Sequence, residues 1–281
     1  MTLLAGIEPV AGVLMHPHSL LEAPRFGADG ELVYSDVIRG GLWACMPDGE
    51  PRELLGRRRG IGGALAHAQG GWVVSGRTVV HVRADGSQRE LLSGEGVCGY
   101  NDLGSTPDGA LLAGVLRYRP LQGEQPRPGQ LLLLERAGGV RVLSEELVWP
   151  NGIGCARDGA TAYVSDYSSA TVFAVALDGS GTSPFCRSPR GSADGLALDC
   201  GGGVWVALGE GGAVARFHPD GSLHELVELP ASFVSSLCFA GADMRDVLIT
   251  TADNERHPQL GGTLLRARSE IAGAAVAALE V

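Results

Sequence analysis

NGIGCARDGATAYVSD, residues 151–166, contains two turn signals, Asn151-Gly152 and Asp158-Gly159, seven residues apart. An Asn-Gly pair between apolar runs usually marks a tight hairpin. A hairpin at residue 151 would leave no room for a normal strand before the turn at residue 158. We therefore predict that Asn151 begins a short strand, that Asp158-Gly159 is the turn, and that the β-rich run after it is a second strand.

The same unit of strand, glycine turn and strand recurs along the chain. Six rows begin at residues 22, 62, 101, 151, 194 and 235, as EAPRFGADGELVYSD, GGALAHAQGGWVVSG, NDLGSTPDGALLAGV, NGIGCARDGATAYVSD, DGLALDCGGGVWVAL and SSLCFAGADMRDVLIT. A repeat of about 40 to 50 residues is typical of four-stranded propeller blades. We predict one all-β domain over residues 1–281, a six-bladed β-propeller with four antiparallel strands per blade. The last blade takes its fourth strand either from the N-terminal segment or from the C-terminal AAVAALEV.

Composition and charge limit the classes of partner that this protein can bind. The formal net charge is −10, whereas nucleic-acid binding needs clustered Lys and Arg. The apolar N-terminal stretch has no basic segment and is interrupted by Glu8 and Pro9, and no run of about 18 apolar residues occurs. We expect a soluble cytoplasmic protein, a monomer or weak homo-oligomer, whose partner is a small molecule and neither nucleic acid nor a membrane.

The first residue of each row should lie near the propeller axis, at one end of the innermost strand. These residues are Glu22, Gly62, Asn101, Asn151, Asp194 and Ser235. Asn and Asp often form turns where a strand starts, but Glu is a poor turn former. Two carboxylates brought together on an axis repel each other unless a cation neutralises them. The pattern therefore predicts one divalent metal ion with oxygen ligands: calcium, magnesium or manganese, with zinc or iron(II) also possible.

Connections from the second to the third strand of each blade should surround the same end of the axis. The longest is RYRPLQGEQPRPGQ, residues 117–130, a candidate lid or specificity loop that begins with Arg117. The connection 252–262 of the last blade should lie there too. Tyr100 and Trp149, next to the proposed polar positions, are candidate apolar walls for a small substrate.

The rows resemble the gluconolactonase, regucalcin and senescence-marker-protein family of six-bladed propellers. The resemblance rests on EAPRF from residue 22, YNDLGSTPDG from 100, PNGIGCARDG from 150, ADGLALDCGGGVWVAL from 193 and VSSLCFAG from 234. It implies that Glu22, Asn151 and Asp194 bind one divalent cation and that Asn101 contacts substrate or bound water. It also implies lactone hydrolysis, with the cation polarising the carbonyl and Asp194 accepting a proton from water.

Two departures concern the substrate. Members that act on sugar lactones commonly have Arg two residues before the first Asn, where this chain has Gly99, and Ala23 replaces the usual Gly after the Glu. A less polar lactone therefore becomes an alternative to a sugar lactone. Two further alternatives stay open: metal-dependent hydrolysis of another ester or acyl bond, and a non-catalytic propeller that binds a metal or ligand.

Overall fold

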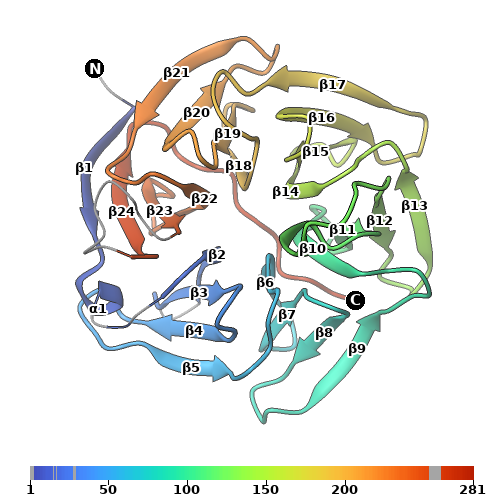
Figure 1. Ribbon diagram of the computed structural model, residues 1–281, viewed down its shortest axis with the longest axis horizontal. Coiled ribbons are helices and arrows are strands. Elements are labelled where there is room, and N and C mark those ends of the chain that lie inside the picture. Colours follow the sequence, from blue (N-terminus) through green and yellow to red (C-terminus); the bar gives the residue numbers. More distant parts are fainter. Residues whose placement is uncertain (1–2, 15, 17, 28–29, 253–260) are drawn as a thin grey trace.

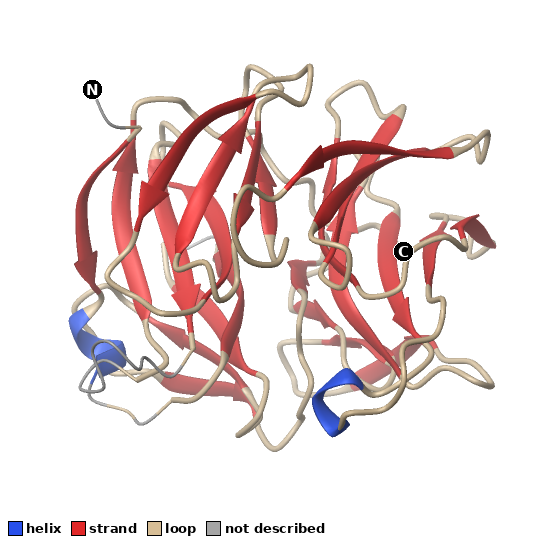
Figure 2. Ribbon diagram, turned by 45° about the horizontal axis from the view of Figure 1, so that its top comes forward, coloured by secondary structure: helices blue, strands red, loops and turns tan. Residues whose placement is uncertain are grey.

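The structure, a computed structural model, describes residues 3–14, 16, 18–27, 30–252 and 261–281. These residues form six four-stranded antiparallel sheets arranged radially around one axis (Figure 1). The predicted six-bladed β-propeller is confirmed. Strands make up nearly all of the regular structure, and the short helix α1 (Ala11–Leu14) and 3-10 helix η1 (Pro120–Gln122) lie outside the blades (Figure 2).

Each blade is built outward from the axis. The innermost strands are β2 (Leu21–Phe26), β6 (Ala64–Ala66), β10 (Gly99–Ser105), β14 (Pro150–Cys155), β18 (Leu196–Leu198) and β22 (Val234–Ala240). The second strands are β3 (Leu32–Asp36), β7 (Trp72–Val74), β11 (Leu111–Leu116), β15 (Thr161–Asp166), β19 (Val204–Ala207) and β23 (Asp246–Thr251). The third strands are β4 (Leu42–Cys45), β8 (Val79–Val82), β12 (Gln130–Leu134), β16 (Thr171–Ala176), β20 (Ala213–Phe217) and β24 (Leu264–Ser269). The outermost strands are β5 (Arg52–Leu55), β9 (Gln88–Leu92), β13 (Val140–Ser144), β17 (Thr182–Arg187), β21 (Leu223–Glu228) and β1 (Leu4–Pro9).

The N-terminal segment closes the ring. Strand β1 pairs antiparallel with β24, with Leu4 opposite Ser269 and Pro9 opposite Leu265. Joining the two ends of the chain in one sheet covers an edge that would otherwise be exposed. The C-terminal AAVAALEV is not a blade strand; it crosses the middle of the ring at one end of the axis (Figure 1).

The predicted turn at Asp158-Gly159 joins β14 to β15. The amide of Gly159 donates to the carbonyl of Ala156 at 2.9 Å, and the Asp158 carboxylate accepts from the amide of Ala160, also at 2.9 Å. Gly159 has a φ of 70°, a left-handed conformation that glycine adopts without steric cost. The Asn151-Gly152 pair lies inside β14 and forms no hairpin, as predicted.

The hydrophobic core lies between neighbouring blades. Leu112 and Leu131 of one blade, for example, share a buried cluster with Ala162 and Val164 of the next. Both faces of a blade are therefore covered, which explains why β12 is buried along its whole length. Burying each large aliphatic side chain contributes about 1.5–3 kcal/mol, so packing between blades holds the inner strands in place. Among the described residues, no helix is long and apolar enough to cross a membrane.

Candidate active site

Four inner strands carry a polar residue at the same end of the axis. Glu22, Asn101 and Asn151 lie in β2, β10 and β14, and Asp194 precedes β18 by two residues. The register of β10 against β11, and that of β14 against β15, shifts at the two asparagines. Bulges of this kind re-aim side chains at the edge of a sheet. Here they let the carboxamides face the axis instead of the packing between blades.

All four polar side chains line one cavity of about 240 Å³. Glu22 and Asn151 are each 7% exposed and Asp194 is 2% exposed, so bulk water barely reaches them. Most of the remaining described lining is apolar: Leu20, Val37, Ile38, Leu121, Phe233 and Ala252. The cavity therefore combines two carboxylates and two carboxamides with a hydrophobic mouth.

The two carboxylates repel each other. Burial, followed by the charges of Asp194 and Asp102, raises the pKa of Glu22 well above its ordinary value. Burial, followed by the charges of Asp102 and Glu210, raises the pKa of Asp194, and the hydrogen bond from Asn151 only partly opposes this shift. Burial also raises the pKa of Asp102, the residue after Asn101, to about 6. The charge of Arg25 lowers the pKa of Glu22 and of Asp102 but does not offset these increases, so the buried negative charge stays unfavourable without a further cation.

The carboxamides are held by specific contacts. The Nδ2 of Asn151 donates to the Asp194 carboxylate, and the Nδ2 of Asn101 donates to the Pro150 carbonyl at 3.0 Å. A Cβ at Gly62 would lie 2.6 Å from the Asn101 Oδ1, so only glycine leaves room for that side chain at the equivalent position of the second blade. These contacts fix each amide relative to the neighbouring inner strand.

Gly152 allows the fourth and fifth blades to approach closely. A Cβ at this position would lie 2.2 Å from the backbone nitrogen of Leu196. The Gly152 amide instead donates to the Asp194 carbonyl at 3.2 Å. This backbone contact places Asn151 beside Asp194. It is possible only because the residue after Asn151 is glycine.

Comparison with known proteins identifies the family. The sequence model of the family described as SMP-30/Gluconolactonase/LRE-like region matches residues 20–253 of this chain. This chain belongs to that family. It is 27% identical to a 6-deoxy-6-sulfogluconolactonase from Pseudomonas putida, over 95% of this chain and 97% of the relative.

Solved structures of family members have the same fold. A gluconolactonase from Xanthomonas campestris is 26% identical, with a TM-score of 0.77 over 92% of this chain and 88% of that one. A calcium-binding regucalcin from Agrobacterium tumefaciens is 22% identical, with a TM-score of 0.83 over 99% of this chain and 98% of that one. At this identity the second likeness concerns the fold alone.

The residues of this family member fit a divalent cation. No group of three or more His, Cys, Asp or Glu side chains in the described part of the chain is placed to hold a metal ion. A cation in this cavity would thus need carboxamide oxygen as well as Glu22 and Asp194. Carboxylate and amide oxygens are hard ligands suited to calcium, magnesium or manganese. The buried, mutually repelling carboxylates supply the physical reason for a cation to bind there.

Some candidate residues lie elsewhere. Tyr100 is 2% exposed and belongs to the hydrophobic cluster between the second and third blades, so its side chain is not part of the cavity lining. Arg117 is not in that lining either. Ser235 is fully buried and donates to the Leu21 carbonyl at 2.6 Å, which is a structural contact. Of the connection 252–262, residues 253–260 lie outside the described residues.

Tyr167 was missed by the sequence analysis, although it lines the cavity beside Trp149. The two rings lie 4.5 Å apart, and Tyr118 meets Trp149 edge-on at 6.4 Å. The Tyr167 hydroxyl donates to Glu210 at 3.1 Å. Tyr167 is the first residue after β15, and the connections that follow second strands surround this end of the axis. That positional rule could have found it, as it finds Leu121 in loop 117–130, which also lines the cavity.

Proposed function

We propose that this protein is a hydrolase that opens lactones with the help of one divalent cation held by Glu22, Asn151 and Asp194. The main support is the convergence of two buried carboxylates and two carboxamides in one cavity of a gluconolactonase-family propeller. Relatives named as 6-deoxy-6-sulfogluconolactonase and gluconolactonase support the reaction class. When bound, the cation would polarise the lactone carbonyl and favour the oxyanion that develops there.

The chain's own residues have separate roles in this proposal. Asp194 accepts a proton from the attacking water. Asn101, held through its Nδ2 by the Pro150 carbonyl, orients the substrate or the water. Trp149 and Tyr167 form a wall against which a substrate ring can pack.

The substrate is a lactone with an apolar substituent. The described lining contains no charged side chain besides Glu22 and Asp194, and Gly99 supplies no side chain to bind sugar hydroxyls. Leu20, Ile38 and Phe233 would instead contact a hydrocarbon chain or ring. A heavily hydroxylated substrate would place some of its hydroxyl groups against this apolar part of the lining, which is costly in a desolvated site.

A substrate panel tests the proposal. Acid release from gluconolactone, aliphatic γ- and δ-lactones, an aromatic lactone and simple esters is measured after EDTA treatment and after each metal is added back. We expect turnover only with metal and a higher kcat/KM for aliphatic lactones than for gluconolactone. Preferential turnover of open-chain esters would favour a general ester hydrolase. Saturable metal binding without turnover of any compound would point to a binding protein and defeat the proposal.

A further inference from the structure

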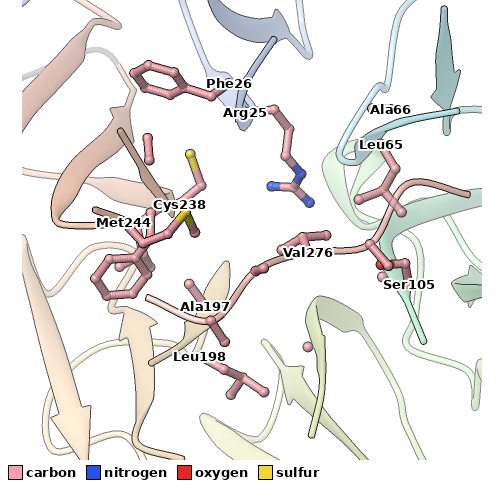
Figure 3. Close-up of a pocket in the computed structure, with 18 of the residues that line it drawn as sticks. Arg25, Phe26, Leu65, Ala66, Ser105, Ala197, Leu198, Cys238, Met244 and Val276 are labelled. Atoms are coloured by element: carbon pink, nitrogen blue, oxygen red, sulfur yellow. The ribbon is translucent and has the colours of Figure 1, made fainter. Parts of the chain in front are cut away.

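A second and larger cavity lies at the opposite end of the axis. It has a volume of about 490 Å³ and is lined by the far ends of the inner strands, including Ile153. Leu65, Ser105 and Leu198 of the same lining are labelled in Figure 3. Its lining does not include the four polar residues of the candidate active site. The volume is within the range of about 300–1,000 Å³ that is usual for small-molecule sites.

Arg25 is the only charged side chain in the described lining of this cavity. Its guanidinium extends into the cavity (Figure 3), where Nη1 donates to the Pro24 carbonyl at 2.7 Å. The Nε of Arg25 is buried without a hydrogen-bond partner. Arg25 forms no ion pair within 4 Å of a described carboxylate, although its charge lowers the pKa of the buried Glu22 and Asp102. The side chain as a whole is partly buried, but its Nε is a buried donor without an acceptor, which is unfavourable in a desolvated site.

Ser105 provides a second unpartnered polar atom. Its Oγ is also buried without a hydrogen-bond partner. Five such side-chain atoms occur in the described residues, and two of them, the Nε of Arg25 and the Oγ of Ser105, belong to residues that line this one cavity. The rest of the lining is mostly aliphatic or aromatic. The cavity therefore has an apolar lining with one cationic donor, Arg25, and one hydroxyl, Ser105.

The C-terminal segment covers the cavity. Its backbone is tied to the fifth blade through Ala274, whose amide donates to the Leu198 carbonyl at 2.8 Å, and to the second blade through Leu279, whose amide donates to the Ala66 carbonyl at 2.9 Å. Residues 275–278, between these anchors, form no backbone hydrogen bond to the blades, and Val276 is 61% exposed. A short span fixed only at its ends can bow outward at little cost, which provides a route for a ligand.

We propose that this cavity binds a small monocarboxylate with an apolar body, at a site separate from the candidate active site. The carboxylate accepts hydrogen bonds from the Arg25 guanidinium, including its Nε, and the apolar body packs against Leu65, Leu198 and the covering segment. Guanidinium and carboxylate form charge-assisted hydrogen bonds of matching planar geometry. Ser105 binds a second polar group of the ligand or its carboxylate. This inference does not depend on the proposed hydrolysis.

Octanoate is a suitable probe, with octanamide as its neutral counterpart. Isothermal titration calorimetry of the full chain should show one saturable octanoate site and much weaker binding of octanamide. Arg25→Met should weaken octanoate binding about tenfold or more, and Ser105→Ala several-fold, because each removes a hydrogen bond to a charged ligand. If Arg25→Met does not fold, the comparison of the two probes and Ser105→Ala still decide the question.

The control variants are matched to each change. Arg157→Met removes an exposed arginine outside the cavity, and Ser165→Ala removes another buried hydroxyl that lacks a partner. Both should leave octanoate binding unchanged, as should Asn151→Ala in the candidate active site. Loss of binding in Asn151→Ala would place the probe in the active site and overturn the proposal. Equal binding of octanamide, unchanged binding in Arg25→Met, or no saturable binding by the wild-type protein would also overturn it.

Discussion

Asp194 and Asp199 provide a matched test of the candidate metal site. Both carboxylates are 2% exposed. Asp199 accepts hydrogen bonds from Arg216 at 2.8 Å and from Trp205 at 2.9 Å, and these contacts outweigh burial and lower its pKa. Burial, followed by the charges of Asp102 and Glu210, raises the pKa of Asp194. Replacing each aspartate by Asn should therefore change the stability of the metal-free protein in opposite directions.

The expected changes in the free energy of unfolding follow from the pKa shifts of the buried carboxyl groups. Burial raises the pKa of the nearby Asp102 from 3.8 to about 6, and each pKa unit corresponds to about 1.4 kcal/mol, so one buried carboxylate here costs roughly 3 kcal/mol when charged. We expect Asp194→Asn to stabilise the metal-free protein at neutral pH by about 1–3 kcal/mol. Asp199→Asn should destabilise it by about 3–5 kcal/mol, because it leaves Arg216 buried without its anionic partner.

The pH dependence of this stability difference shows whether the charge of Asp194 causes it. A carboxyl with a raised pKa in the folded state stabilises the fold at low pH, and this contribution is lost as pH rises from its unfolded pKa toward its folded one. Asp194→Asn and the wild type should therefore be about equally stable near pH 4 and diverge as pH increases. Urea unfolding in EDTA, followed by tryptophan fluorescence across this range, measures the difference.

Added metal should remove or reverse the stability difference between the wild type and Asp194→Asn. A cation at one hundred times its Kd stabilises the wild type by about 2.7 kcal/mol and stabilises Asp194→Asn much less. If Asp194→Asn destabilises the EDTA-treated protein at neutral pH as strongly as Asp199→Asn, the carboxylate repulsion inferred here is absent. If metal stabilises both proteins equally, Asp194 is not a ligand.

Three further predictions concern single residues. Ala23 has a φ of 52°, so Ala23→Gly should raise the free energy of unfolding by about 0.5–1 kcal/mol in urea titrations, and a decrease would mean that this conformation carries no strain. Asp102→Asn should flatten the fall in metal-free stability that this residue causes between about pH 4 and its folded pKa of about 6, and an unchanged slope would assign that fall to other groups. Trp149→Ala should lower kcat/KM for aliphatic lactones about tenfold and for gluconolactone less, and an equal loss for both would argue against an apolar wall.

Local sequence signals located most of the candidate site. Glu22, Asn101, Asn151 and Asp194 start four of the six repeats, which was enough to expect their convergence, since a propeller repeats one geometry around one axis. The same reasoning predicted Tyr100 as a cavity wall, whereas its side chain is not part of the cavity lining. Alternation along a strand does not reveal where a bulge interrupts it, and the register shift in β10 lies directly after Tyr100, which packs between blades.

Several features depend on contacts between distant parts of the chain. Both terminal segments were plausible final strands, and only packing against β24 selects the N-terminal one, which leaves the C-terminal segment to cover the second cavity. Three features likewise arise when six blades close into a ring: the burial of Asp194, the packing of Tyr167 beside Trp149, and the Arg25 Nε without a hydrogen-bond partner. The sequence by itself determined the repeat, the strands and the polar residues at the starts of four repeats, because these follow from local periodicity. The tertiary structure alone decided which side chains share a desolvated space, because that depends on the packing free energy of residues far apart in the chain.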